Sequence, residues 1–461
     1  MQFTVIGITD NPHPFFPPEI LDIIRKGKIF SGGRRHHEIV APFLPKNTQW
    51  IDITVPLDAV FEQYHDEVVV FASGDPLFFG FANTLQRQFP DAELKVYPTF
   101  NSLQMLAHRM LIPYHNMRIV SLTGRPWQEF DKALIEGAGK IGILTDKEHT
   151  PAAIARRMLE YSYTNYNICV GEHLGNPELE KITTCTLQEA AERQFSTPNC
   201  VIAQADSSLF TLHSSLKFGI PDSKFTFLDG REKMITKMPI RLLTLQSLDL
   251  GRRHTLWDIG ACTGSISIEA RLLFPHLQIE AFEIRPECKA IIQENARRFG
   301  APGINVHIGD FLNSQLPLRS RVPLATPSAF STLNSQLPLR SRVPLATPSA
   351  FSTLNSQYST LNSQLSTLNS QFSILNSQLP LPDAVFIGGH GGKLKEMMEK
   401  VLTVLAPDGV IVMNSVVAPK VTTDSRKLWN EACQELGLQQ EPPLHIQLND
   451  NHPITILKCK R

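Results

Sequence analysis

The chain has 461 residues and 44 basic and 44 acidic side chains, so its formal net charge is zero. This length suffices for two or three domains of roughly 100–200 residues. The balanced charge disfavours a general nucleic-acid binder, which would carry a basic excess, and no apolar run reaches the roughly 20 residues of a membrane helix. The seven cysteines include no Cys-x-x-Cys pair. We therefore predict reduced thiols, no protein-bound metal, no secretory signal and a cytoplasmic location.

The first half alternates apolar strands with helical stretches. We predict a helix at 151–161 and strands at residues 3–8, 67–73, 94–98, 117–122, 140–145, 166–172 and 199–204. Continuous β-branched runs separated by helices are typical of a mainly parallel sheet that is covered on both faces. We therefore expect an α/β domain at residues 1–206, followed by a Ser-rich linker at 207–218.

The second half shows the same alternation. We predict helices at 265–273, 286–299 and 394–405, and strands at 255–260, 278–284, 304–310, 383–389 and 409–416, followed by a terminal pair near HIQLND and ITILKCK. This pattern predicts a doubly wound, Rossmann-like α/β domain at residues 219–461.

Tandem repeats interrupt this second domain at residues 312–380. Residues 312–332 and 333–353 are identical, and shorter units that begin with LNSQ follow. The Ser-, Asn-, Gln- and Pro-rich composition predicts a mostly disordered insertion in one loop. The alternative is a tract that binds a partner or associates with itself through β-pairing. A loop tolerates such an insertion because the entropy of loop closure grows slowly with length.

Acidic and small residues mark the ends of three successive predicted strands in the second half. They are Asp258, Gly260, Thr263, Gly264, Glu283 and Asp310. Small residues before a helix let a ligand approach the backbone and the free N–H groups of the helix N-terminus. A carboxylate at Glu283 can accept hydrogen bonds from the ribose hydroxyls, and one at Asp310 can accept a hydrogen bond from an adenine amino group. A tight turn beside a buried acid is the alternative, but three such features in order favour nucleoside binding.

The second half resembles class I S-adenosylmethionine-dependent methyltransferases. With the string DAVFIGGHGG at 383–392, the segment GIPD at 219–222, and Lys237 and Arg241, it is similar to the C-terminal half of the bifunctional corrin-ring methyltransferases of cobalamin synthesis. Cys262 stands where this loop usually has glycine.

This resemblance implies roles for the residues that carry it. The loop residues named above, with Gly388 and Gly389, would bind S-adenosyl-L-methionine, and the catalytic residues would be His390, Lys237 and Arg241. The activity implied for this half is methylation of C-15 of a precorrin or cobalt-precorrin, with decarboxylation of the C-12 acetate arm.

A second loop of interest follows the predicted strand at 67–73. Ser73, Gly74, Asp75 and Pro76 form either a plain turn or a ligand loop. The stretch resembles the loop that borders the methyl-donor site in the tetrapyrrole methylases, and a stretch containing Thr123 and Gly124 extends the resemblance. It implies a second S-adenosylmethionine site, methylation of C-5, and assembly into a homo-oligomer.

A polycarboxylate substrate would need cationic side chains near each pocket. The candidates are Arg34, Arg35, His36, His37 and Arg125 in the first half, and Arg231, Lys233, Lys237, Arg241, His390 and Lys393 in the second. The alternative for each is a solvated surface charge. Glycines flank His390, so core packing explains it poorly, and we favour it as a site residue.

Two other functions remain open at this point. The first is a methyltransferase that acts on RNA or a small molecule, although RNA binding would call for a basic patch. The second is a fusion whose C-terminal half is inactive, because the repeats directly follow Asp310.

Overall fold

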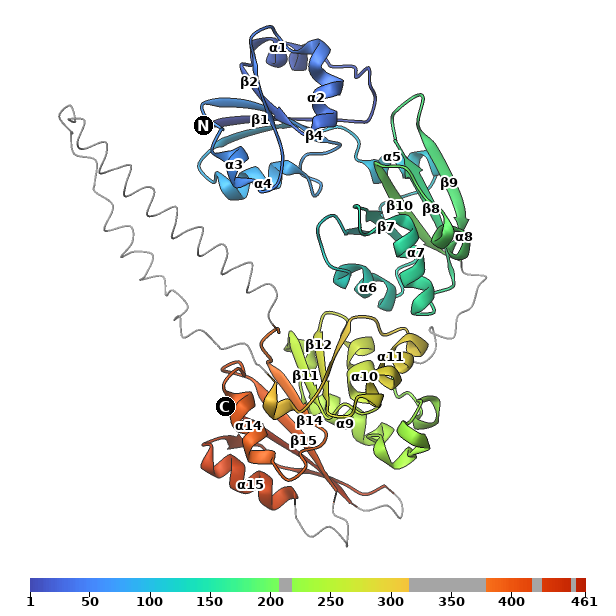
Figure 1. Ribbon diagram of the computed structural model, residues 1–461, viewed down its shortest axis with the longest axis vertical. Coiled ribbons are helices and arrows are strands. Elements are labelled where there is room, and N and C mark those ends of the chain that lie inside the picture. Colours follow the sequence, from blue (N-terminus) through green and yellow to red (C-terminus); the bar gives the residue numbers. More distant parts are fainter. Residues whose placement is uncertain (207–217, 315–378, 417–424, 449–452) are drawn as a thin grey trace, which may run out of the picture. The chain divides into compact units, whose positions relative to one another are not determined.

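The computed structural model describes residues 1–206, 218–314, 379–416, 425–448 and 453–461. The described parts of residues 1–218 and 296–303 form one compact unit, and those of residues 219–295 and 304–461 form the other (Figure 1). Most of the predicted repeat insertion and most of the predicted linker lie outside the described residues.

The first sheet of the first unit is parallel throughout, in the strand order β3-β2-β4-β1-β5. Its strands are β1 (Gln2–Ile8), β2 (Ile29–Gly32), β3 (Gln49–Asp52), β4 (Glu67–Ser73) and β5 (Glu93–Tyr97). The intervening helices are α1 (Pro18–Lys26), α2 (Arg34–Val40), η1 (Ala41–Phe43), α3 (Asp58–Phe61) and α4 (Phe81–Gln88). Because Ile8 pairs with Ser73, the loops that follow β1 and β4 leave the sheet side by side.

The second sheet of this unit has the order β6-β7-β10-β8-β9. Its strands are β6 (Arg118–Ser121), β7 (Lys140–Leu144), β8 (Tyr166–Glu172), β9 (Lys181–Thr186) and β10 (Asn199–Ala205), and its helices are α5 (Ser102–Met110), α6 (Gln128–Ile135), α7 (Pro151–Glu160) and α8 (Leu187–Glu192). Only β6 and β7 are parallel, and the other three pairings are antiparallel. The prediction of a mainly parallel sheet is therefore wrong here.

This difference has a simple physical reason. Ile168 and Val170 of β8 pack into one core, whereas Cys169 packs into another on the opposite face. A strand that is buried on both faces gives a continuous apolar run whichever way its neighbour runs.

The second unit contains a sheet of order β13-β12-β11-β14-β15-β18-β16, with β17 paired to β18. The strands from β13 to β15 are parallel, and β18 runs antiparallel to β15. The strands are β11 (Thr255–Ile259), β12 (Gln278–Glu283), β13 (Ile304–Ile308), β14 (Ala384–Ile387), β15 (Val410–Val416), β16 (Gln439–Gln440), β17 (Leu444–Ile446) and β18 (Ile454–Lys460). The strand order reverses between β11 and β14, and ligands of doubly wound folds bind at such a point.

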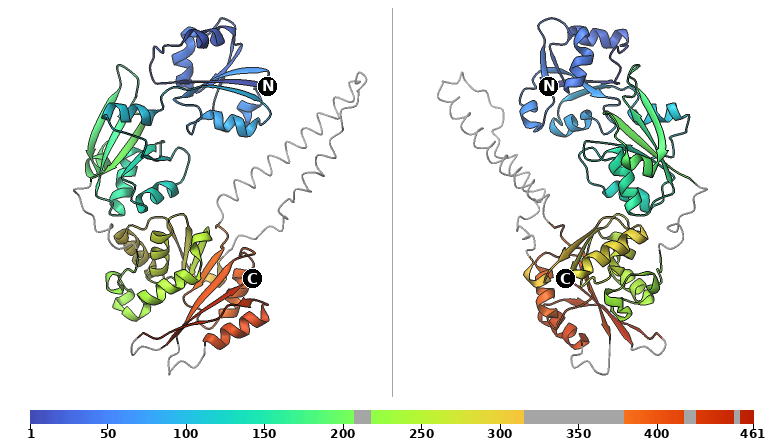
Figure 2. Two further views of the ribbon diagram at one scale, coloured as in Figure 1. Left: turned by 180° about the vertical axis from the view of Figure 1, so that it is seen from behind. Right: turned by 45° about the vertical axis from the view of Figure 1, so that its right-hand side comes forward.

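Helices cover both faces of this sheet (Figures 1 and 2). The α-helices are α9 (Met238–Ser247), α10 (Ser265–Leu273), α11 (Glu287–Phe299), α14 (Leu394–Leu402) and α15 (Ser425–Glu435), and the short 3₁₀ helices are η3 (Asp222–Lys224), η4 (Leu228–Gly230), η5 (Glu232–Met234), η6 (Leu250–Arg252) and η7 (Phe311–Asn313). Trp257 and Ile259 of β11 pack with α14 and α15, whereas Leu256 packs with α9 and α10. The predicted α/β class is thus confirmed. None of the helices that the structure describes combines the length and apolar character needed to cross a bilayer.

Candidate functional site

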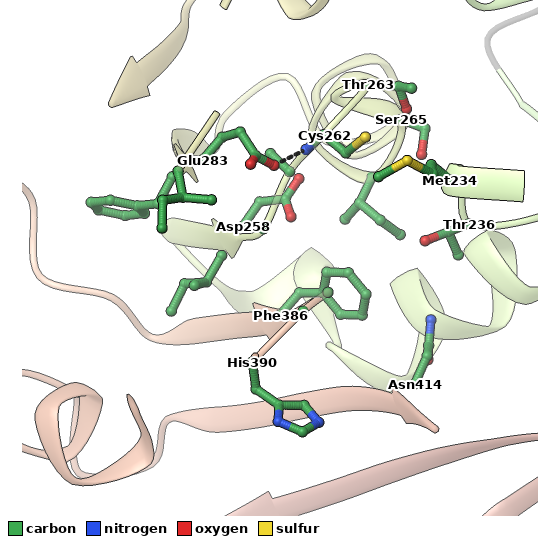
Figure 3. A pocket seen from close by; sticks show the side chains of 18 of the residues that line it. Met234, Thr236, Asp258, Cys262, Thr263, Ser265, Glu283, Phe386, His390 and Asn414 are labelled. Atoms are coloured by element: carbon green, nitrogen blue, oxygen red, sulfur yellow. Dashed lines mark hydrogen bonds between the residues drawn. The ribbon is translucent and has the colours of Figure 1, made fainter. Parts of the chain in front are cut away.

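A cavity of about 920 Å³ opens at the C-terminal ends of the parallel strands of the second unit. Its walls are the loops after β11, β12, β13 and β14, together with residues 234–237 before α9 (Figure 3). It therefore lies at the point where the strand order reverses, as the doubly wound fold predicts.

The floor of this cavity is made of backbone. Gly260 has a φ of 82°, and a Cβ atom added there would lie 2.9 Å from the backbone nitrogen of Gly389. A Cβ atom on Gly388 would lie 3.0 Å from the carbonyl oxygen of Gly260. Side chains at these positions would push the two loops apart. Cys262 adopts a φ of 50°, a left-handed conformation that favours glycine.

Asp258 is the penultimate residue of β11, and only one of its two carboxyl oxygens has a hydrogen-bond partner among the described residues. Its Oδ2 accepts hydrogen bonds from the backbone N–H and the hydroxyl of Ser267, at 3.2 and 2.6 Å. Its Oδ1 is buried and has no hydrogen-bond partner in the described parts of the chain. Burial raises the pKa of Asp258 to about 6. Asp258 lines the cavity, and its unpaired carboxyl oxygen suits a cationic ligand, which would favour the ionised carboxylate.

Glu283, at the end of β12, is 2% exposed and lines the same cavity (Figure 3). It accepts a hydrogen bond from the backbone N–H of Cys262 at 2.8 Å. Arg285 donates three more, from its backbone N–H at 3.1 Å, Nε at 2.8 Å and Nη2 at 2.9 Å. Burial alone would raise the pKa of Glu283, but these hydrogen bonds hold it below its usual value.

Asp310 caps the short helix η7 at the edge of the cavity. Its Oδ1 accepts from the backbone N–H of Leu312 at 3.0 Å, and its Oδ2 accepts from the side-chain amide of Asn313 at 3.2 Å. The third predicted acid therefore lies at the same cavity as the other two.

His390 lines the cavity from the loop after β14 (Figure 3). Its Nδ1 accepts the backbone N–H of Gly392 at 3.1 Å, so Nε2 carries the proton, and Nε2 lies 3.3 Å from the hydroxyl of Ser425. Burial lowers the pKa of His390. The imidazole is therefore a neutral hydrogen-bond donor at neutral pH.

Of the other predicted residues, Thr263, Gly389, Lys237 and Lys393 also line the cavity, whereas Gly264 caps the N-terminus of α10. Arg231 lies in an exposed turn, 3.5 Å from Asp229. The side chain of Lys233 is outside the described structure.

Arg241 requires a correction, because it does not line the cavity. Its side chain is fully buried and forms an ion pair with the buried Glu269. It also donates to the carboxylate of Asp222 at 3.2 Å and to the carbonyl oxygens of Thr236, at 2.7 Å, and Ile220. With these partners it holds the segment that bears Thr236 against the cavity, and it is not placed to contact a ligand.

Among the lining residues that sequence reasoning did not single out are two with polar side chains, Arg285 and Asn414. Asn414 accepts from the hydroxyl of Thr244 at 3.1 Å, and its buried Nδ2 has no partner among the described residues. The signal that could have revealed Asn414 is a lone amide within the apolar strand VIVMNSV.

The first unit has its own cavity, of about 410 Å³, lined by the loops after β1, β2 and β4 and by residues of α5. Asp10 is 8% exposed and accepts from Nη1 of Arg35 at 2.6 Å, while its other oxygen lies 2.9 Å from Nδ1 of His173. The hydroxyl oxygen of Ser73 accepts from Nη2 of Arg35 at 2.9 Å and lies 2.9 Å from Nε2 of His36.

The direction of these bonds follows from His36. Its Nδ1 accepts the backbone N–H of Gly33 at 3.2 Å, so Nε2 carries the proton and points it toward Ser73. Burial and the neighbouring Arg35 lower the pKa of His36 to about 4, which keeps the ring neutral. Ser73 thus accepts two hydrogen bonds, and its own proton is available to an acceptor in the cavity.

The remaining predicted residues of the first half are spread more widely. Gly74 lines the cavity with Ser73, but Asp75, Pro76 and Thr123 are not among its lining residues. Gly124 lines a separate recess, where its N–H donates to Asp146 at 2.9 Å. The structure therefore does not bring Thr123 and Gly124 to the cavity of Ser73.

The cationic candidates of this half also divide. Arg35 and His36 line the cavity. Arg34 pairs with Glu38 on an exposed helix face, His37 stacks on Trp50, and Arg125 lies 5.3 Å from the centre of the Phe79 ring. Among the residues described, no group of three or more His, Cys, Asp or Glu side chains is placed to hold a metal ion.

Comparisons with known proteins match each half of the chain to a family. Residues 11–191 match the tetrapyrrole (corrin/porphyrin) methylases, and residues 228–316 match the precorrin methyltransferase domain. A precorrin-6Y C(5,15)-methyltransferase [decarboxylating] from a Sinorhizobium species is 29% identical over 94% of this chain and 88% of its own length.

Two Salmonella typhimurium proteins match shorter parts. A cobalt-precorrin-6B C(15)-methyltransferase (decarboxylating) is 26% identical over 51% of this chain and 93% of its own length. A cobalt-precorrin-7 C(5)-methyltransferase is 27% identical over 38% of this chain and 85% of its own length. The chain is thus similar along nearly its whole length to a precorrin methyltransferase, and a region that matches the tetrapyrrole methylases is followed by one that matches the precorrin methyltransferase domain.

Proposed function

We propose that this chain is a bifunctional enzyme that methylates C-5 and C-15 of a precorrin or cobalt-precorrin and decarboxylates its C-12 acetate arm. The observation that carries the proposal is the presence of a separate cavity in each of the two units, each beside a region that matches a methyltransferase family. One methyl-transfer site at each cavity accounts for a relative that acts at two carbons and for relatives that act at one.

The methyltransferase family implies S-adenosylmethionine as donor, and the residues of the second cavity fit it. The unpaired Oδ1 of Asp258 suits the ammonium group of its amino-acid end. Glu283 and Asp310 would accept from the ribose and adenine groups, and the backbone floor at Gly260 leaves room for the nucleoside. When bound, the donor supplies an electrophilic methyl group on a sulfonium.

Methyl transfer depends mainly on position. The protein must hold the accepting carbon in line with the sulfur–methyl bond, and such positioning supplies about 7–11 kcal/mol in well-oriented models. Lys237 and Lys393 would bind carboxylate arms that do not react. Asn414 would donate its free N–H to the ring or to an arm.

The arm that loses CO₂ needs a different environment. A cation against the reacting carboxylate would stabilise the starting state more than the transition state, because the negative charge leaves that carboxylate as CO₂ forms. His390 is neutral and lines the cavity, and its Nε2–H lies 3.3 Å from the Ser425 hydroxyl, which it would leave to donate to this arm. We propose that His390 orients this arm while the conjugated ring accepts the electron pair.

The first cavity would carry out C-5 methylation. Ser73 and Gly74 would contact the donor, and Arg35 would contact an anionic group. Phe79 and Phe100 line the same cavity and are 45% and 55% exposed, so their rings can lie against a flat conjugated macrocycle. Assembly into a homo-oligomer is part of the proposal, and sedimentation of the full chain tests it.

Titration of the full chain with S-adenosylhomocysteine tests the two sites. We expect two binding sites, and only one in Asp258→Asn. A single site in the unaltered chain would instead support the alternative of an inactive C-terminal half.

Incubation with cobalt-precorrin-6B and S-adenosylmethionine, followed by mass analysis, tests the activity. We expect two methyl gains and the loss of one CO₂. Asp258→Asn should lose C-15 methylation and keep C-5 methylation, and simultaneous loss of both would contradict two independent sites.

A further inference from the structure

Glu283, the proposed ribose acceptor, is already fully engaged by the protein. We propose that the side chain of Arg285 is a latch, by which we mean a group that occupies Glu283 until a ligand displaces it. The ribose diol of the methyl donor displaces the Arg285 guanidinium, which then binds a carboxylate of the substrate. This inference rests on the proposed donor site in the second cavity.

The hydrogen-bond count at Glu283 shows why the latch must open. A carboxylate offers about four acceptor positions. Each oxygen of Glu283 receives one backbone N–H, from Arg285 or Cys262, and one N–H of the Arg285 guanidinium. A ribose diol brings two further O–H donors, so two of the four existing donors must leave.

The two guanidinium donors are the ones that can leave. The backbone N–H groups of Cys262 and Arg285 belong to loops fixed at strand ends, whereas the Arg285 side chain is 33% exposed and lines the cavity. Withdrawal of this side chain leaves Glu283 with two backbone donors and two free acceptor positions that face the ligand.

A displaced guanidinium then lacks an anion. Within the described structure, Glu283 is the one carboxylate that forms an ion pair with Arg285, and the side chain also contacts Met234 Sδ, 3.9 Å from Nη1, and the thiol of Cys262. Lys237 and Lys393, which share the cavity, are also cationic. The partner must therefore come from a ligand, and a planar guanidinium matches a carboxylate with two parallel hydrogen bonds.

This exchange couples the two ligands thermodynamically. When S-adenosylmethionine binds without the substrate, two neutral hydroxyls replace the charged guanidinium as hydrogen-bond partners of Glu283. This exchange weakens the binding of S-adenosylmethionine alone. A substrate carboxylate that pairs with the released guanidinium restores the loss. By linkage, each ligand must raise the affinity of the other by the same factor.

The test uses the full chain and S-adenosylhomocysteine, which has the ribose diol but no methyl group to transfer. Its affinity for the second site is measured by calorimetry with and without cobalt-precorrin-6B, and the second site is the one lost in Asp258→Asn. In the unaltered chain we expect cobalt-precorrin-6B to tighten binding by about fivefold or more. In Arg285→Gln we expect tighter binding without the substrate, little further gain with it, and a raised KM for cobalt-precorrin-6B.

A second variant and a ligand pair separate the latch from other roles. Arg285→Lys keeps the charge but cannot hold both oxygens, so it should bind S-adenosylhomocysteine tightly and keep part of the coupling. Arg285→Gln should also strengthen the binding of adenosine but not that of 2′,3′-dideoxyadenosine, which has no diol to displace the latch.

Arg252→Gln provides a matched control. Arg252 donates from Nε and Nη2 to Asp249, at 3.1 and 2.5 Å, and lies outside the second cavity, so its loss should change none of these affinities. Weaker or unchanged binding of S-adenosylhomocysteine to both Arg285 variants would overturn the inference. A lack of binding to the second site of the unaltered chain would instead refute the proposed function.

Discussion

Replacing Asp258 by asparagine tests the electrostatics of the second cavity. Asp258 is 1% exposed, and burial raises its pKa from 3.8 to about 6. Between these values the unfolded chain has released the proton that the folded protein still holds. Ionisation of Asp258 therefore destabilises the folded protein progressively as the pH rises from about 4 to about 6. The rise in the pKa of Asp258 corresponds to a loss of about 3 kcal/mol in the free energy of unfolding once the carboxyl is fully ionised. About 1.4 kcal/mol of this loss develops between about pH 5 and pH 8.

Urea unfolding at these two pH values measures the effect. Trp257 and Trp429 are fully buried in this unit and report its unfolding by fluorescence. Relative to the unaltered chain, Asp258→Asn should be more stable at about pH 8 than at about pH 5 by about 1.4 kcal/mol. An equal difference at both pH values would refute a raised pKa at this carboxyl.

The pH dependence of ligand binding also tests the raised pKa of Asp258. If the ionised Asp258 pairs with the ammonium group of S-adenosylhomocysteine, affinity should fall about tenfold for each pH unit below about 6. Adenosine has no such group, so its affinity should stay nearly constant over this range. A parallel loss for both ligands would show that Asp258 does not contact the amino-acid end.

Three further predictions concern other residues. Ser73→Ala removes a hydroxyl that is oriented by Arg35 and His36, and it should reduce binding of S-adenosylhomocysteine at the first site about tenfold. The control is Ser121→Ala, which removes a hydroxyl that accepts a hydrogen bond from an arginine but lies outside this cavity, and it should leave the binding unchanged. Arg241→Met leaves the buried Glu269 unpaired and should lower the free energy of unfolding by about 3–5 kcal/mol, whereas adding Glu269→Gln should recover much of it; no loss in the single variant would contradict the structural role of Arg241. Asn414→Ala should raise the KM for cobalt-precorrin-6B about tenfold and leave the affinity for S-adenosylhomocysteine unchanged, and a change in that affinity alone would place the Asn414 amide at the donor.

The bounds predicted from the sequence were most accurate for elements in which a run of apolar residues ends abruptly at polar residues. The predicted bounds of β4, β8 and α10 match those of the structure. It missed β3 (QWID) and β9 (KITTCT), because both are edge strands and pack only part of their length into a core. It also missed β2 (IFSG), which is buried but only four residues long.

The candidate site divides in the same way. Asp258, Glu283 and Asp310 were predictable because the C-terminal ends of parallel strands meet at one edge of a sheet. Arg241 was misassigned because its buried partner Glu269 lies on another helix, and nothing in the local sequence reveals that pairing. Arg285 was missed because it lies two residues after the end of β12, where a charged side chain resembles an ordinary surface residue.

The backbone floor of the second cavity has a consequence for how this enzyme can change. At Gly260 and Gly388 an added Cβ atom would lie within about 3 Å of backbone atoms, so substitutions at these two positions would disturb the floor. The opposite wall carries Thr236, Lys237 and Asn414. Directed evolution toward new methyl acceptors should therefore yield its improved variants on that wall, with the glycines of the backbone floor left unchanged.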